Sequence, residues 1–348
     1  MARNKLTIMS AACALVAILI LVLGCRTLQS EPPPVNDVAE RQITLLGFAA
    51  GTTSQLWMDA VGEALRRENP GWTVTSKAAG GEARLIASRL AGEADFFITL
   101  GLRRLEVLVQ EPLHPDIDYE RASEYRLVIP AFLMPVHFLA RTDTGLATPG
   151  DIVERRYPYH LGIGAGVARN LFFLSLQHYG ASPDDAASWG ASYETLLMNS
   201  AEGVEALLSG RVDTGFTYAG IPNSVLAGIT SGVRLLPLDD PGLASTLAEW
   251  GCLPASIPSG TYSYVTEDVE TVAPLQSLAT RADMPDDVVY GLLEAVFEHR
   301  DLILAAHGGA AQLWTPEFLS TAIALGERNG EPYHPGALRF YQEQGWIG

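Results

Sequence analysis

From residue 41 onward, short apolar runs alternate with segments whose apolar residues recur at helical spacing. In the first stretch this pattern predicts strand, helix, strand, helix and strand at 43–47, 55–68, 73–78, 82–90 and 94–99. In a second stretch it predicts strand, helix, helix and strand at 160–163, 168–179, 201–208 and 212–217. Alternation of this kind favours parallel sheets covered by helices on both faces.

The two stretches end alike. "LAGEADFFIT" (90–99) and "LSGRVDTGFT" (208–217) each show a helix that stops at glycine, then a charged residue, then an aspartate that enters a short apolar strand. We therefore expect an α/β fold of two similar lobes. The strand carboxyl ends and helix amino ends of each lobe should meet at one edge of its sheet, where ligands bind in such folds.

The remaining segments complete the expected layout. We expect a loop at 183–190, a strand within 270–284 and one helix over 285–307. The chain should cross between the lobes near 135–141 and again near 257–264. We predict a signal peptide over 1–24 and a lipidated cysteine with a flexible tether over 25–40. The first lobe should comprise 41–137 plus 262–348, and the second lobe 138–261.

The amino-terminal segment predicts export. Arg3 and Lys5 precede an apolar run over 6–23, which is typical of a secretory signal. The following Gly24-Cys25 resembles the end of a bacterial lipobox, in which Cys25 carries the lipid. An uncleaved membrane anchor is the alternative, because the run approaches the roughly 20 apolar residues that span a bilayer. Both interpretations place the folded part outside the cytoplasmic membrane, and the lipid would attach it to the membrane surface.

Composition narrows the function further. The 348 residues carry a formal net charge of −17, whereas a nucleic-acid-binding protein needs basic surface, so we expect no nucleic-acid partner. A local cluster of arginines and helix amino ends can still attract a small anion. Once Cys13 leaves with the signal and Cys25 carries lipid, Cys252 stands alone, which excludes an internal disulfide.

A glycine-rich turn in the second stretch is the first candidate binding loop. In "GIGAGVARN" (162–170) the last glycine of the dinucleotide fingerprint is replaced by Val167, which argues against nucleotide binding. The loop Gly164-Ala165-Gly166 would aim the backbone N–H groups of 167–169 at open space, with Arg169 on the first helical turn, and this suits a carboxylate. The alternative is a tight turn beside a solvated arginine.

The first stretch offers two counterparts. Thr52, Thr53 and Ser54 precede a helix and can cap it or hydrogen-bond a ligand. Gly80-Gly81 repeats the glycine-then-helix design, with Arg84 on the first turn. Arg84 and Arg169 are the natural partners for an acid, although either can equally be a surface residue.

Enzyme signatures are missing from the sequence. It contains no G-x-S-x-G, no H-E-x-x-H and no paired cysteines for zinc. His137 lies among apolar residues and His334 precedes the last helix, which predicts structural roles for both. We expect no catalytic residues, no cofactor and no metal-ligand set, and a hydrolase ranks last among the possible functions.

Several segments resemble one family. "IPSGTYSYVTEDVETVA" (257–273), "PYHPGALRFYQEQG" (332–345), "AGGEARLIASRLAGEADFFI" (79–98) and "GRVDTGFTYAGIPNSVL" (210–226) are similar to the TAXI group of solute-binding proteins, which serve tripartite ATP-independent periplasmic (TRAP) transporters. The resemblance implies a bilobed, type II periplasmic-binding-protein fold with a hinge and no catalysis. It also implies a monomer that captures a small organic acid, glutamate or a C5 dicarboxylate, and delivers it to a membrane transporter subunit.

The resemblance also implies which residues bind the ligand, through five loops. They are Gly51, Thr52, Thr53, Ser54 and Gln55; Gly80, Gly81 and Glu82, with Arg84 beside them; Thr99; Gly164, Ala165, Gly166, Val167, Arg169 and Asn170; and Thr217 and Tyr218. This chain departs from the family inside these loops: Ser54 and Gln55 stand near the places of tyrosines, and Val167 replaces a hydroxyl residue. A different acid, or a lipid-anchored sensor on the same fold that signals to a membrane partner, is therefore an open alternative. Whether a metal bridges ligand and protein is also open.

Overall fold

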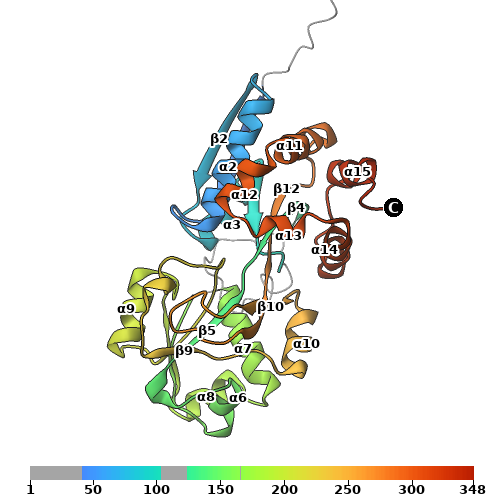
Figure 1. The fold of residues 1–348 in the computed structure, drawn as a ribbon. Coiled ribbons are helices and arrows are strands. Elements are labelled where there is room, and N and C mark those ends of the chain that lie inside the picture. The colour runs from blue at the N-terminus through green and yellow to red at the C-terminus, as the bar shows by residue number, and fades with distance from the viewer. Residues whose placement is uncertain (1–40, 103–123, 165) are drawn as a thin grey trace, which may run out of the picture. The chain divides into compact units, whose positions relative to one another are not determined.

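The computed structural model describes residues 41–102, 124–164 and 166–348, and residues 41–348 belong to one compact unit. The predicted signal peptide, Cys25 and the tether lie outside the described residues. Within the described ranges, none of the helices combines the length and the apolar character needed to cross a bilayer. The strands of these described residues form two five-stranded sheets and one two-stranded sheet, and helices pack around them (Figure 1).

The first sheet has the order β2-β1-β3-β12-β4. Its strands are β1 (Arg41–Gly47), β2 (Trp72–Ala78), β3 (Phe96–Thr99), β4 (Tyr125–Leu133) and β12 (Leu275–Arg281). Strands β2 and β3 flank β1 in parallel, and β12 runs antiparallel between β3 and β4. The amino end of β12 therefore lies at the edge where β1, β2 and β3 end.

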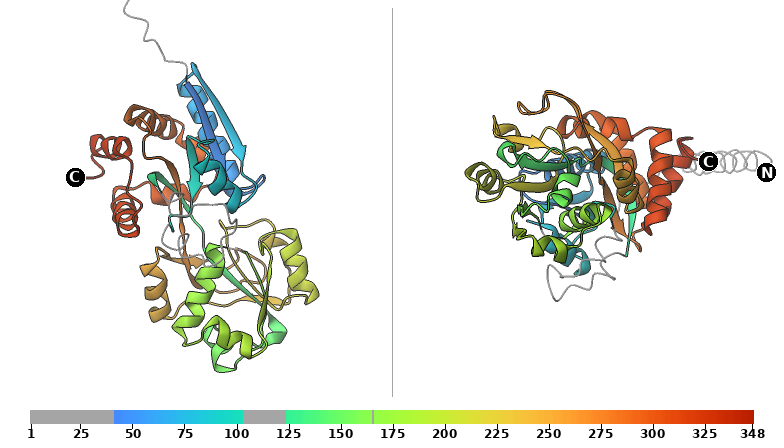
Figure 2. Two further views of the ribbon diagram at one scale, coloured as in Figure 1. Left: turned by 180° about the vertical axis from the view of Figure 1, so that it is seen from behind. Right: turned by 90° about the horizontal axis from the view of Figure 1, so that it is seen from below.

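Seven helices accompany this sheet in the described part of the chain. They are α2 (Thr53–Glu68), α3 (Glu82–Leu90), α11 (Asp286–Glu298), α12 (Arg300–Ala306), α13 (Ala310–Leu313), α14 (Pro316–Asn329) and α15 (Pro335–Glu343). Helix α2 packs on β1 and β2 and contacts α11 and α12, while α13 and α14 contact β4. Figures 1 and 2 show the late helices, coloured orange to red, gathered beside this sheet. Its core is dominated by large buried side chains, among them Trp57, Phe96, Phe97, Phe132 and Tyr341.

The second sheet repeats this plan in the order β7-β6-β8-β5-β9. Its strands are β5 (Val136–Arg141), β6 (His160–Ile163), β7 (Ser192–Thr195), β8 (Thr214–Tyr218) and β9 (Val233–Leu235). Strands β7 and β8 flank β6 in parallel, and β5 runs antiparallel beside β8. Strand β6 thus corresponds to β1, β8 to β3, and β5 to β12, so the repeated plan expected from the sequence is confirmed.

Short helices and a β-ribbon surround the second sheet. They are α6 (Gly150–Glu154), α7 (Val167–His178), α8 (Pro183–Ser188), α9 (Ala201–Ser209), α10 (Pro241–Glu249), the 3₁₀ turns Thr142–Thr144 and Leu226–Gly228, and the paired strands β10 (Leu253–Ile257) and β11 (Val269–Ala273). The core under α7 is an aromatic cluster of Phe138, Phe172 and Phe216, whose ring centroids lie 5.3–5.7 Å apart. Edge-to-face aromatic contacts of this kind add to the stabilisation from burial.

The matching aspartates have the same role in both sheets. Asp95 enters β3 and its Oδ2 accepts a hydrogen bond from the backbone N–H of Thr44 at 2.8 Å. Asp213 enters β8 and its Oδ1 accepts from the backbone N–H of His160 at 2.9 Å. Each carboxylate therefore fixes the strand that it precedes to the backbone of the neighbouring parallel strand, which explains the repeated sequence pattern.

Met198 explains two glycines of the second sheet. A Cβ at Gly162 would lie 2.3 Å from the Met198 sulfur, and a Cβ at Gly215 would lie 2.7 Å from its terminal methyl carbon. The fully buried Met198 side chain packs directly on the backbone of β6 and β8. Gly162, the first glycine of the candidate loop motif, therefore makes room for core packing.

Three sequence expectations for local structure are wrong. The expected loop at 183–190 contains α8, whose cap Ser182 and Asp185 bond each other reciprocally in a capping box. The expected helix over 285–307 breaks at His299, where Nε2 lies 2.9 Å from the Glu68 carboxylate at the end of α2. The single strand expected within 270–284 is two strands, because Pro274 has no N–H and separates β11 from β12.

The two connections between the sheets run side by side. Pro135 separates β4 from β5, Pro274 separates β11 from β12, and the N–H of Met134 donates to the Pro274 carbonyl at 3.0 Å. Tyr262 and Val265 pack in a core cluster with residues of the second sheet. The lobe limits at residues 137 and 262 stay predictions. After the second sheet, β12 is the first strand of the chain that pairs in the first sheet again.

Candidate functional site

The predicted loops all follow the carboxyl ends of parallel strands. In the first sheet, β1 leads into the loop before α2, β2 leads to Gly80, and β3 ends at Thr99. In the second sheet, β6 leads to Gly164 and β8 ends at Tyr218. Because parallel strands end at the same edge, each sheet collects its own predicted loops at one edge.

Thr52 caps a helix. Its Oγ1 accepts a hydrogen bond from the backbone N–H of Gln55 at 3.3 Å and donates to the carbonyl of Ala49 at 2.7 Å. The neighbouring Gly51 is exposed, and its φ of +78° is in the left-handed region that favours glycine. The hydroxyl of Thr52 therefore stabilises the start of α2, in agreement with the capping alternative.

Ser54 and Gln55 are buried against the first sheet. The Ser54 hydroxyl donates to Oε1 of Gln276 at 2.7 Å, and Gln55 Nε2 donates to Asp59 at 2.7 Å and to Ser76 at 3.0 Å. Sequence analysis missed Gln276, which lies at the amino end of β12. A long polar side chain two residues after Pro274, at the start of a strand, is the signal that could have identified it.

The glycine pair at 80–81 opens α3. Gly80 and Gly81 have φ of +87° and +150°, and no side chain accepts a hydrogen bond at the cap position of α3. The N–H of Gly80 donates to the Phe48 carbonyl at 2.7 Å, which joins this loop to the one after β1. Arg84 is exposed on the first turn of the helix. The side chain of Glu82 lies outside the described part.

Thr99 belongs to a buried polar cluster at the end of β3. Its Oγ1 lies 3.1 Å from the Tyr125 hydroxyl, which donates in turn to the buried carboxylate of Glu331. The Arg89 guanidinium lies 4.8 Å from the centre of the Tyr125 ring. The cluster joins three segments that are far apart in the sequence, which is why spacing along the chain did not indicate it.

The second glycine turn opens α7 in the same way. Gly166 has a φ of +80° and supplies no capping side chain, and Val167 is fully buried. The Arg169 guanidinium stacks 4.7 Å from the centre of the Tyr193 ring, and its Nη2 donates to the Thr195 hydroxyl at 3.3 Å. These contacts hold Arg169 at the carboxyl end of β7. Asn170 continues the helix, and Ala165 lies outside the described residues.

Thr217 and Tyr218 at the end of β8 pair with the start of β5. Thr217 lies opposite the fully buried His137, whose Nδ1–H donates to the Pro135 carbonyl at 2.9 Å. His137 Nε2 accepts from the Tyr262 hydroxyl at 2.9 Å, and that oxygen accepts from the Asn223 N–H at 3.1 Å. Burial lowers the pKa of His137 to about 4. The structural role predicted for His137 is confirmed.

His334 and Cys252 are also structural. The Nδ1 atom of His334 accepts from the Gly336 N–H at 3.1 Å, which caps α15, and Nε2 bonds the Met284 carbonyl at 2.9 Å. Cys252 is buried, and burial raises the pKa of its thiol to about 12, so it is not a nucleophile. Among the described residues, no three His, Cys, Asp or Glu side chains gather as a metal site would require.

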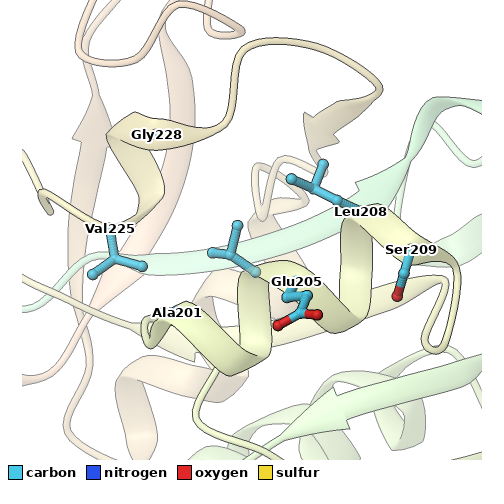
Figure 3. A pocket seen from close by; sticks show the side chains of 7 residues that line it. Ala201, Glu205, Leu208, Ser209, Val225 and Gly228 are labelled. Carbon is cyan, nitrogen blue, oxygen red and sulfur yellow. The ribbon is translucent and has the colours of Figure 1, made fainter.

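A hollow beside the second sheet is lined by residues outside the predicted loops. It has a volume of about 540 Å³, and Figure 3 shows its lining residues on α9 and around the 3₁₀ turn Leu226–Gly228. They are Ala201, Val204, Glu205, Leu208, Ser209, Val225 and Gly228. Its single charged group is a carboxylate, so this hollow does not suit an anionic ligand.

The two sheets have the same strand plan, and each carries its loops at the edge where its parallel strands end. Together they define the bilobed periplasmic-binding-protein fold, as expected from the sequence. The model of the NMT1-like family matches residues 47–345, and the chain belongs to this family.

The chain is similar to solved structures at low sequence identity. MatC from Rhodopseudomonas palustris, solved with bound malate, is 16% identical and has a TM-score of 0.52, with 83% of this chain and 97% of MatC covered. The periplasmic binding protein BugD is 13% identical with a TM-score of 0.49, covering 88% of this chain and 99% of BugD. A TctC solute-binding protein from Polaromonas is 13% identical with a TM-score of 0.44, covering 83% and 97%.

Proposed function

We propose that this protein is an extracytoplasmic receptor that captures a small organic acid between the carboxyl edges of its two sheets. The observation that carries the proposal is the pair of helices α3 and α7. Both begin at a glycine, and neither has a capping side chain bonded to its first turn, whereas α2 is capped by Thr52. First-turn N–H groups that lack a side-chain acceptor favour an anion.

Arg169 is the charge partner that the geometry favours most. Its guanidinium is held by Tyr193 and Thr195 beside the first turn of α7, so a carboxylate at that helix start would meet both backbone donors and a fixed cation. Arg84 has the equivalent place on α3 in the first sheet. A carboxylate removed from water needs such pairing, because an unpaired buried ion loses several kcal/mol of solvation.

The remaining features of the proposal concern delivery. We assign the protein to the TAXI group within its family, with Cys25 lipidated and the chain anchored to the membrane as a monomer. A TRAP-type membrane subunit would then accept the acid. Support comes from the sequence segments similar to TAXI proteins and from the fold shared with MatC, whose structure contains malate.

Thermal melting of residues 41–348 against single acids tests the proposal. The panel contains L-glutamate, malate and 2-oxoglutarate, with L-glutamine as the comparison that has no net charge and a single carboxylate. A ligand at about 100 times its Kd stabilises the folded state by roughly 2.7 kcal/mol, which raises the melting temperature measurably. A selective rise with one acid supports the receptor. No rise with any acid, in protein freed of co-purified ligand, contradicts carboxylate binding and favours the sensor alternative.

The variant Arg169→Ala tests the charge partner. We expect the affinity for the stabilising acid to fall at least about tenfold, which corresponds to about 1.4 kcal/mol. Arg155→Ala is the matched control, because Arg155 is an exposed arginine at the end of α6, beside the second sheet, that pairs with Asp151. Equal affinities in both variants, measured by titration calorimetry, would remove Arg169 from the site.

A further inference from the structure

His307 lies at the edge of the first sheet that carries the predicted binding loops, although no sequence motif indicated this residue. It follows α12, and its ring centroid lies 4.5 Å from that of Phe132, near the end of β4. Strand β4 runs parallel to β3, because both are antiparallel to β12. The end of β4 and the His307 ring therefore share the edge that carries the loops after β1, β2 and β3.

One hydrogen bond fixes the tautomer of this ring. The backbone N–H of Gly309 donates to Nδ1 of His307 at 3.2 Å. A ring nitrogen that accepts carries no proton, so the neutral ring has its hydrogen on Nε2. Burial lowers the pKa of His307, which keeps the ring neutral near pH 7. His307 therefore presents Nε2–H as a donor.

This donor has no acceptor among the described residues. Nε2 is buried without a hydrogen-bond partner there. A Cβ built on Gly220 would lie 3.2 Å from Nε2 and 3.6 Å from the Thr53 hydroxyl, so the donor and the first residue of α2 flank one backbone position just after β8. Gly220 does not have a positive φ. Gly220 therefore leaves the position beside Nε2 and Thr53 free of a side chain. The backbone conformation at this position does not itself require glycine.

We propose that His307 is a ligand-binding residue, and that its Nε2–H donates to an oxygen of the bound acid beside Thr53. This inference rests on the proposed function and adds a specificity to it. A neutral Nε2–H can only donate, so it selects a carboxylate, carbonyl or hydroxyl oxygen at this position and disfavours an ammonium group. The acid is thereby held by Arg169 from the second sheet and by His307 from the first.

Two substitutions separate the donor from the shape of the ring. His307→Phe keeps a flat ring without a donor, and His307→Gln keeps an N–H donor. Malate, 2-oxoglutarate and L-glutamate are titrated into residues 41–348 by calorimetry. We expect His307→Phe to weaken the acid that binds wild type by about tenfold or more, and His307→Gln by about threefold or less. His160→Gln, exposed at the opposite end of β6, is the control and should bind as wild type.

The outcomes distinguish this inference from the proposed function. Binding in wild type that His307→Phe leaves unchanged overturns the role of His307 alone. Failure of all three acids to bind wild type overturns the proposed function and, with it, the ligand role of His307. Two-bond ¹H–¹⁵N spectra of the free protein give a further readout without any ligand. A hydrogen on Nδ1 would contradict the donor assignment, and a hydrogen on Nε2 supports it.

Discussion

Replacing His137 by glutamine tests whether a buried neutral histidine makes this fold sensitive to acid. The ring is fully buried between the Pro135 carbonyl and the Tyr262 hydroxyl, each 2.9 Å from a ring nitrogen. A second proton on Nε2 would break the bond from Tyr262 and would charge a group that is removed from water. Removal of the ring from water lowers the pKa of His137 from 6.5 to about 4, although the hydrogen bond to the Pro135 carbonyl opposes this shift.

The sign and size of the effect follow from linkage. The folded pKa is below the unfolded one, so between pH 4 and 6.5 the unfolded chain binds more protons and the free energy of unfolding falls as the pH falls. With these two pKa values, His137 alone removes about 2 kcal/mol of stability between pH 7 and pH 5. The full loss, once both states are protonated, is about 3 kcal/mol.

Urea unfolding at pH 7 and pH 5 measures this loss in wild type and in His137→Gln. The variant should be less stable at pH 7, because its packing and hydrogen bonds change. Its further decrease on going to pH 5 should nevertheless be smaller than that of wild type by about 2 kcal/mol. The control His160→Gln, at an exposed position, should follow wild type. If wild type and His137→Gln lose equal stability to within about 0.5 kcal/mol, His137 is not held neutral by burial.

Two further predictions concern packing and hydrogen bonds. Gly203→Ala should lower the free energy of unfolding by about 1–3 kcal/mol, because its Cβ would lie 2.3 Å from the Leu197 carbonyl oxygen. Gly291→Ala, in open space on α11, should raise the free energy of unfolding by up to about 1 kcal/mol. Thermal melting compares the two variants, and the reverse order of stability would contradict the close approach at Gly203. Ser54→Ala should cost about 1–3 kcal/mol because it leaves the buried Gln276 amide oxygen without its donor, and an unchanged urea midpoint would show that this bond contributes nothing.

The fold was predictable where each sheet carries its own local signal. The strands of the first βαβαβ unit and the helices between them were predicted within about two residues. Strands β1 and β3 contain short continuous apolar runs, which is the pattern of buried parallel strands. The repeated aspartate was a usable signal for a physical reason. Asp95 and Asp213 each bond the backbone of the first strand, so the fold requires a carboxylate at that point in both units.

The missed elements lack such signals. Strand β7 (Ser192–Thr195) is an exposed edge strand with no apolar alternation, so its sequence resembles a loop. The places of β5 and β12 are set by pairing with strands 70–180 residues away, which periodicity does not encode. Helix α8 did have a readable signal, since Ser182 and Asp185 have the spacing of a capping box.

For the site, the sequence could select loops but not the direction of side chains. Ser54 and Thr99 lie in predicted loops, yet their hydroxyls bond Gln276 and Tyr125 inside the protein. In the proposed site, the groups suited to an anion are backbone N–H donors behind glycines, the stacked Arg169 and the Nε2–H of His307. Such a set recognises charge and oxygen acceptors more than it recognises carbon skeletons. A panel that varies the carboxylates and polar groups of the acid is therefore more informative for this protein than one that varies chain length.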